Sequence, residues 1–269
     1  MPAPIATESK VIKMNDWFPP KAYYDSELPE VAWLLENLSL SDRERFQSLN
    51  KTPGEFSHGR SAYHNFDCSI MNIADDIAYG VHDLEDAIHL SLIGREQLDS
   101  SSFRQLLSED FKQQEQDKLV DCLFSPEIHL RKQAIGQIVN YFITSIDIKI
   151  THADFENPLL KYNVALPDAP AALLEFFIQF IFKLVIDSQK ARTFEYGGQT
   201  IILRLFEAIS SNPESLLSEN LRTLYRQAAE TGEDAAYRVI CDYIANMTDE
   251  HAHRLHERLF GFSKQFGFF

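Results

Sequence analysis

Residues 66–93 read FDCSIMNIADDIAYGVHDLEDAIHLSLI, and the chain is organised around this stretch. At about 100° per residue, its apolar side chains gather on one side of a helix. This predicted core face comprises Ile70, Ile73, Ala74, Ile77, Val81, Leu84 and Ile88. The opposite face carries acids around one phenol, namely Asp75, Tyr79, His82, Asp83 and Asp86. The pattern therefore predicts one long amphipathic helix over residues 66–93.

The acidic face of this helix has no compensating bases. No Lys or Arg occurs between Arg60 and Arg95, so the acids lack the cationic i,i+4 neighbours that exposed helices use. A tyrosine ring among acids favours partial burial with its hydroxyl bonded. A solvated face is the plain alternative, because charged helix faces usually meet water. The uncompensated acids instead favour a cation or a positively lined pocket.

Three stretches resemble one known family. The segment Ala74–Ile88, ADDIAYGVHDLEDAI, resembles the last metal-ligand helix of the dGTP triphosphohydrolase family, a branch of the HD-domain phosphohydrolases. Pro19–Glu27 resembles the stretch after the family's substrate-binding lysine, and Arg238–Asp249 resembles its C-terminal signature helix. The stretches occur in family order, so the resemblance covers most of this chain. It implies the C-terminal portion of a family member.

The resemblance also implies a reaction. Family members cleave a deoxynucleoside triphosphate, dGTP or another dNTP, into the deoxynucleoside and inorganic triphosphate. A divalent metal, Mg or Mn, suits carboxylate ligands and activates a water. Asp75 corresponds to the final metal ligand, Tyr79 to a sugar and phosphate contact, and Asp83 to the acceptor of the 3′-hydroxyl. Their spacing of four residues places all three on one helical face, in agreement with these roles.

Two basic positions complete the implied substrate site. Lys10 or Lys13 corresponds to the family's substrate lysine, and we assign Lys13; two solvated lysines are the alternative. Arg238 begins the C-terminal signature and could reach a nucleotide phosphate, in its own subunit or in a neighbour. Its alternative is an ion pair with Asp234 or Asp242.

The rest of the implied metal site is not found where the family keeps it. The family's upstream His and His-Asp ligands should lie before the segment that opens this chain. A partner chain would then supply them. A substitute set would join His82 and Asp83 to His58 or His64, but adjacent residues diverge by about 100° on a helix. It would also use Asp83 twice.

Composition bounds the fold. Ten Gly and eleven Pro among 269 residues are few and favour helices over a turn-rich β fold. We expect an all-α, multi-helix bundle of the HD-domain phosphohydrolase type, with a minor β ribbon over Ile146–His152, where β-branched residues alternate. Residues 1–30 hold five prolines and are expected to be an extended segment. Residues 31–269 are expected to form a single helical domain.

Charge and cysteine content bound the location. A net charge of −15 and a pI near 5.0 argue against a nonspecific nucleic-acid surface. Three widely spaced cysteines make neither a disulfide framework nor a zinc site, which favours reduced thiols in the cytoplasm. The N-terminus lacks the apolar core of a signal peptide.

The most apolar segment, Ala171–Ile186, is interrupted by polar residues every four positions. It is predicted to be part of a core helix over residues 171–192, too short and too polar to span a bilayer. We therefore expect no membrane association. Gly197-Gly198 is predicted to separate this helix from the next, Gln199–Ser210. Gly261–Phe269 contains four Phe residues, which would need a docking surface or an oligomer partner.

Three functions fit these observations. The first is a dGTP triphosphohydrolase-like, metal-dependent enzyme or a portion of one, acting as a homo-oligomer or with a partner chain that supplies the His-Asp ligands. The second is a non-catalytic regulatory or assembly subunit of a dNTPase that keeps the nucleotide-contacting helix. The third is a helical interaction module whose acidic face binds a basic protein.

Overall fold

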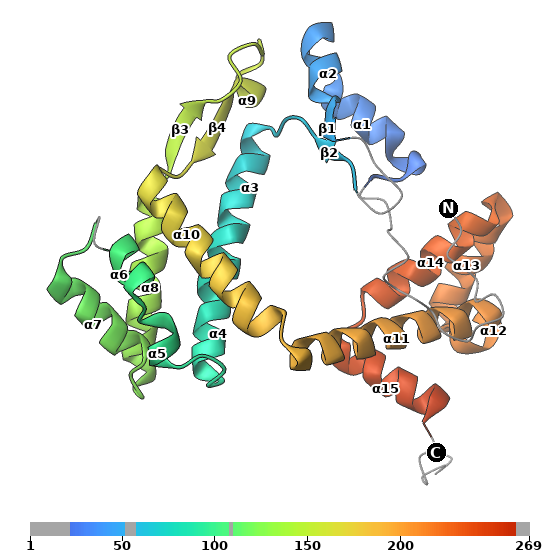
Figure 1. The fold of residues 1–269 in the computed structure, drawn as a ribbon. Coiled ribbons are helices and arrows are strands. Elements are labelled where there is room, and N and C mark those ends of the chain that lie inside the picture. The colour runs from blue at the N-terminus through green and yellow to red at the C-terminus, as the bar shows by residue number, and fades with distance from the viewer. Residues whose placement is uncertain (1–21, 52–57, 108–109, 262–269) are drawn as a thin grey trace. The chain divides into compact units, whose positions relative to one another are not determined.

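A computed structural model describes residues 22–51, 58–107 and 110–261. In these residues the chain is helical apart from two small antiparallel strand pairs, so the predicted all-α class is confirmed (Figure 1). The predicted ribbon is confirmed as well: β3 (Asp147–Ile150) pairs with β4 (Tyr162–Ala165), with Asp147 opposite Ala165. The other pair joins β1 (Leu49–Lys51) to β2 (Arg60–Ser61).

The chain divides into two compact units, residues 1–182 and 183–269, where the sequence suggests one domain over residues 31–269. Besides the strands, the helices of the first unit are η2 (Asp25–Glu27), α1 (Leu28–Leu35), α2 (Leu40–Phe46), α3 (Phe66–Ile77), η3 (Ala78–His82), α4 (Asp83–His89), α5 (Arg95–Leu98), α6 (Ser101–Leu107), α7 (Gln113–Leu123), α8 (Ile128–Thr144), α9 (Pro158–Lys161) and α10 (Asp168–Ile181). Within the stretch expected to be extended, α1 already begins at Leu28, with Pro29 in its first turn, where a missing N–H is tolerated.

The organising helix runs from Phe66 to His89 as α3, η3 and α4 (Figure 1). The side chain of Asn65 caps its start by accepting a hydrogen bond from the backbone N–H of Cys68. Its middle section, η3, is a π-helical turn, a rare feature often found at functional sites. The helix ends before the predicted residue 93, because Ser91 adopts a left-handed backbone conformation with φ of 56°.

The core face of this helix differs from the prediction in its first half. Ile77, Val81 and Leu84 are buried as predicted. The prediction is wrong for Ile70, which is 44% exposed, and for Ala74, which is also exposed, because none of the described elements covers these two side chains.

Helix α10 crosses the buried half of the organising helix (Figure 1). Gly80 permits this crossing, since a Cβ there would lie 3.2 Å from Cδ1 of Leu174 and 3.4 Å from Cβ of Phe177. Phe177 is fully buried, with its ring centroid 5.8 Å from that of Phe103 and 6.3 Å from that of Phe142. The core of the first unit is therefore centred where α10 meets η3.

The membrane prediction for α10 needs a correction. The stretch Asp168–Ile186 has 19 residues and a mean hydropathy of 1.8, enough to cross a membrane by length and composition. Length and composition alone are a weak criterion, because core helices of water-soluble proteins also meet it. The buried side chains of α10 repeat at helical spacing, whereas Glu175, Gln179 and Lys183 are exposed. This pattern favours a core helix.

A buried carboxylate ties α2 to the segment before α9. The side chain of Asp42 is only 1% exposed. It accepts hydrogen bonds from the backbone N–H groups of Glu156, at 3.1 and 3.2 Å, and of Asn157, at 2.8 Å. These bonds satisfy a charged group that burial would otherwise strongly penalise.

The second unit is helical throughout its described residues. After the π-helical turn η4 (Phe182–Ile186) come α11 (Gln189–Ser211), α12 (Pro213–Leu216), α13 (Glu219–Thr231), α14 (Glu233–Ala245) and α15 (Asp249–Phe260). Its core is formed by apolar side chains of α11, α14 and α15 and the loop before α13, namely Leu205, Ile209, Leu217, Ile240, Ile244 and Ala252.

The break predicted at Gly197-Gly198 is wrong. α11 runs through both glycines, and the chain instead leaves the helix earlier, at Asp187 and Ser188. The Ser188 hydroxyl caps α11 by accepting from the backbone N–H of Ala191. A strong start signal at residue 188 thus outweighs the low helix propensity of two glycines.

Candidate functional site

Three of the acidic-face residues, Asp75, Tyr79 and Asp83, lie in successive turns of the organising helix. Asp75 is exposed near the end of α3, whereas Tyr79 in η3 and Asp83 at the start of α4 are half-buried. Burial raises the pKa of the Tyr79 hydroxyl, and the nearby Asp83 carboxylate raises it further. Burial also raises the pKa of Asp83, as does Asp86, while His82 opposes them. Tyr79 and Asp83 are thus close enough to interact electrostatically.

A second carboxylate pair adjoins this face, and sequence reasoning missed it. Burial raises the pKa of Asp76, and the carboxylates of Asp75 and Glu175 raise it further. Glu175 belongs to α10 and is brought here by the crossing at Gly80. Asp76 follows Asp75 directly in the sequence but was not among the predicted site residues, and no sequence signal placed Glu175 beside it. The resulting surface concentrates negative charge that a bound cation would relieve.

The described residues do not by themselves fit a metal ion. Across residues 22–51, 58–107 and 110–261, no group of three or more His, Cys, Asp or Glu side chains is placed to hold one. Asp75 offers one carboxylate, whereas catalytic metal sites use about three protein ligands. A site at Asp75 would therefore need ligands from outside the described residues.

The substitute ligand set that includes His64 is wrong, because His64 and His82 are too far apart to bind one ion. The ring of His64 lies at the start of α3, with its Nδ1 atom 3.4 Å from Sγ of Cys68. His82 is separated from Cys68 by about 21 Å along the helix, and its Nδ1 atom lies 3.9 Å from a carboxylate oxygen of Glu85. One ion cannot contact both histidines.

The two basic candidates stand differently. Lys13 lies outside the described residues. Arg238 lies in α14, and its Nε–H donates to Oδ1 of Asp242 at 2.8 Å, which is one of the ion pairs considered as an alternative. Because both side chains are partly exposed and in adjacent turns, the pair itself contributes little stability.

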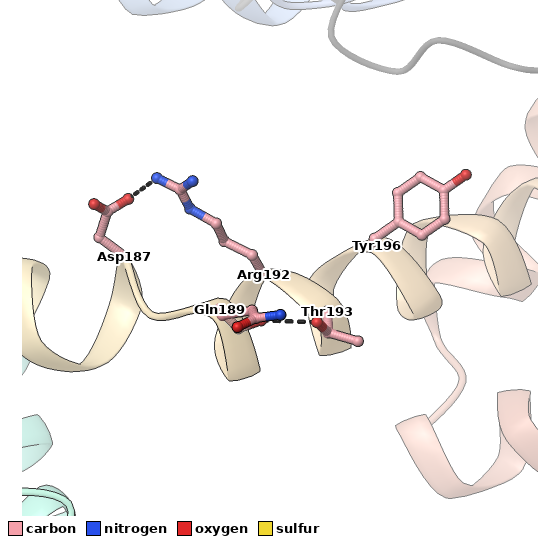
Figure 2. A pocket seen from close by; sticks show the side chains of 5 residues that line it. All are labelled: Asp187, Gln189, Arg192, Thr193 and Tyr196. Carbon is pink, nitrogen blue, oxygen red and sulfur yellow. Dashed lines mark hydrogen bonds and ion pairs between the residues drawn. The ribbon is translucent and has the colours of Figure 1, made fainter.

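Two surface pockets are lined by residues other than those of the acidic face. One, of about 390 Å³, is lined by residues around the ends of α4 and α7, including His89, Phe124 and Arg131. The other, of about 490 Å³, lies on α11 and is lined by Asp187, Gln189, Arg192, Thr193 and Tyr196 (Figure 2). Neither is lined by Asp75, Tyr79 or Asp83.

The sequence is similar to known proteins over nearly its whole length. Residues 164–258 match the family model of the phosphohydrolase-associated domain. A deoxyguanosinetriphosphate triphosphohydrolase-like protein of Vibrio cholerae is 41% identical over 263 residues, 97% of this chain. Proteins of the same name are 42% identical over 262 residues in Shewanella loihica and 41% identical over 259 residues in Actinobacillus succinogenes, covering 96% and 95% of this chain.

The chain belongs to the dGTP triphosphohydrolase-like family. It spans 59% of the length of the V. cholerae relative, 58% of the S. loihica relative and 56% of the A. succinogenes relative. The phosphohydrolase-associated domain of this family member begins in β4 and ends in α15, so it includes α10 and Arg238 but not the acidic face of α3.

Proposed function

We propose that this chain carries the substrate-contacting helix of a dNTP triphosphohydrolase, which cleaves dGTP or another dNTP into the deoxynucleoside and triphosphate. The observation that carries the proposal is the succession of Asp75, Tyr79 and Asp83 along one helix, within a chain 97% of which aligns to a relative bearing that name. We also propose that it acts in the cytoplasm, which its free cysteines favour.

Each residue has a distinct role in this proposal. Asp75 supplies one carboxylate to a divalent ion, Mg or Mn, and the other ligands come from a partner chain or from residues outside those described. Such an ion, when bound, acidifies a water and screens phosphate charge. Tyr79 contacts the sugar and phosphate, and its half-buried ring holds the hydroxyl in place. Asp83 accepts a hydrogen bond from the 3′-hydroxyl.

The phosphates need cationic partners, since the acidic face would repel them. We propose Lys13 and Arg238 for this role. Arg238 would release Asp242 and bind phosphate in its own subunit or in the neighbouring subunit of a homo-oligomer. A guanidinium suits this contact because it binds phosphate oxygens through two parallel hydrogen bonds.

The test is complementation. This chain, the part of the V. cholerae relative outside the alignment, and their mixture are assayed for dGTP hydrolysis with Mn²⁺. Turnover is expected in the mixture and should fall at least about 100-fold in Asp75→Ala, because removing a metal ligand removes the activated water. Asp86→Ala, which removes an exposed carboxylate in the turn after Asp83, is the matched control and should retain activity.

Asp83 is tested with the substrate. A 2′,3′-dideoxy-GTP analogue lacks the 3′-hydroxyl, so the wild type should discriminate against it and Asp83→Asn should discriminate less. If dGTP binds but no mixture turns it over, the chain is a regulatory or assembly subunit of a dNTPase and not an enzyme. If dGTP is neither bound nor hydrolysed, the remaining function is the helical interaction module.

A further inference from the structure

The first half of α11 is an unusual helix surface. Phe194 is 71% exposed and Tyr196 is 62% exposed, although both are large aromatic residues. The buried residues of α11, Leu205 and Ile209, both lie in its second half. Ten residues of helix are marginally stable without packing, and glycines in the middle weaken them further. We therefore expect another segment to cover this surface.

The line of residues along α11 from Thr193 over Gly197 to Arg204 is here called the groove. At about 100° per residue, Thr193 and Gly197 lie within about 20° of Arg204 around α11, while Phe194 and Tyr196 flank that line at about 80° on opposite sides. Among the described residues, no atom outside the adjacent backbone of α11 lies within 4 Å of a Cβ built on Gly197, so a side chain there would meet open space. Figure 2 shows the far end, where Arg192 and Tyr196 project from the same side of the helix beside the 490 Å³ pocket.

The C-terminal end of α15 lies beside Arg204, so the residues that follow it begin at this groove. The guanidinium of Arg204 lies 6.0 Å from the ring centroid of Phe260, the last residue of α15. After Gly261, residues 262–269 read FSKQFGFF. We call residues 262–269 the Phe-rich segment; it lies outside the described residues and contains Phe262, Phe266, Phe268 and Phe269.

We propose that the Phe-rich segment docks along α11 of its own chain, from Arg204 over Gly197 into the pocket beside Tyr196. Extended, it reaches about 26 Å, and Thr193 lies only about 16 Å from Arg204 along the helix axis. Its phenylalanines bury apolar surface against Phe194 and Tyr196, and glycine at position 197 lets them approach the backbone closely.

The same chain is favoured over a second copy because of tethering. A segment that begins beside the groove has an effective concentration in the millimolar range, far above that of a separate chain in dilute solution. Docking should therefore be independent of protein concentration. The proposal stands apart from the nucleotide chemistry, since every groove residue belongs to α11 and its preceding turn.

The test is a designed disulfide. In the full chain, Gly197→Cys is combined with Gln265→Cys, oxidised, and the crosslink is identified by peptide mass spectrometry. Gly197→Cys is tolerated because its Cβ meets open space. We expect an intrachain 197–265 crosslink in most molecules, unchanged on 100-fold dilution. Thr223→Cys with Gln265→Cys is the control pair, because Thr223 is exposed on a different helix, α13, and it should crosslink at least tenfold less.

A second variant separates docking from random encounter. Changing the four phenylalanines of the segment to Ser should lower the 197–265 crosslink at least tenfold. It should also accelerate hydrogen exchange of the amides of residues 193–200 at least fivefold, with Leu205 and Ile209 unaffected. A crosslink that survives these changes overturns the proposal. So does one that forms only between chains, which would assign the groove to a second copy.

Discussion

Each unit contains a long helix with a glycine near its middle, and the surroundings of the two glycines differ. At Gly80 a Cβ would lie 3.2 Å from Leu174, so glycine is needed for α10 to cross. At Gly197 no atom lies within 4 Å, so the described structure makes no use of the missing side chain. A glycine in a helix costs stability in either case. Its purpose is thus decided by what approaches it, which for Gly197 is the proposed Phe-rich segment.

The aromatic residues beside each glycine show the same contrast. Phe177, next to Gly80, is fully buried, whereas Phe194, next to Gly197, is 71% exposed. Truncating Phe177 to Ala should lower the free energy of unfolding by about 3–5 kcal/mol, because it leaves a cavity in a packed core. Phe194→Ala in a chain that ends at Gly261 should change it by about 0.5 kcal/mol or less, because no described neighbour covers the ring. Urea denaturation followed by circular dichroism compares them; equal losses would contradict the different packing of the two helices.

Adding a large side chain at each glycine reverses the test. Gly80→Leu should cost about 1–3 kcal/mol of unfolding free energy, because Leu174 and Phe177 would have to shift. In a chain that ends at Gly261, Gly197→Leu meets open space and should leave stability unchanged or slightly higher, since Leu favours helix. Thermal unfolding of the two variants side by side is the measurement. In the full chain Gly197→Leu should lose this gain, because the Leu side chain would stand where the Phe-rich segment is proposed to dock.

The smallest side chain sharpens the contrast further. Gly198→Ala should stabilise the protein by about 0.5–1 kcal/mol, the usual gain from Gly to Ala inside a helix. Gly80→Ala should fail to give that gain, because its methyl group crowds Leu174. Differential scanning calorimetry resolves changes of this size, and similar gains at both sites would refute the tight crossing.

The charges on the organising helix give the most modest effect. The pKa of Asp76 is raised in the folded protein, so its protonated form favours folding, and stability from this group is present below the unfolded pKa near 3.8 and lost as pH rises through the folded pKa. Asp76→Asn removes that loss, so it should stabilise the protein more at pH 7 than at pH 3. Urea midpoints at both values measure it; a larger gain at pH 3 would reverse the sign.

The sequence predicts what depends on one element and misses what depends on two. Periodicity correctly assigned Ile77, Val81 and Leu84 to the core, and alternation correctly located the β3 ribbon. The same periodicity put Ile70 in the core, because a pattern defines a face but not how far a neighbour covers it. The π turn at η3 also has no periodic signature.

The candidate site divides in the same way. The spacing of Asp75, Tyr79 and Asp83 put them on a helix, and the structure places them in successive turns. Glu175 beside Asp76 depends on the crossing of α10, which involves residues distant in sequence. Helix propensity likewise placed a break at Gly197-Gly198, whereas the Ser188 cap sets the start of α11 and the helix continues through the glycines.

The Asp42 carboxylate sets an order for assembly. Its backbone partners at Glu156 and Asn157 are 114 and 115 residues further along the chain. During synthesis α2 therefore emerges long before the backbone N–H groups that donate to its carboxylate are made, and closing so long a loop is slow. The α1–α2 segment therefore cannot make these contacts until residues 156 and 157 have been made, although it is among the earliest parts of the first unit to leave the ribosome.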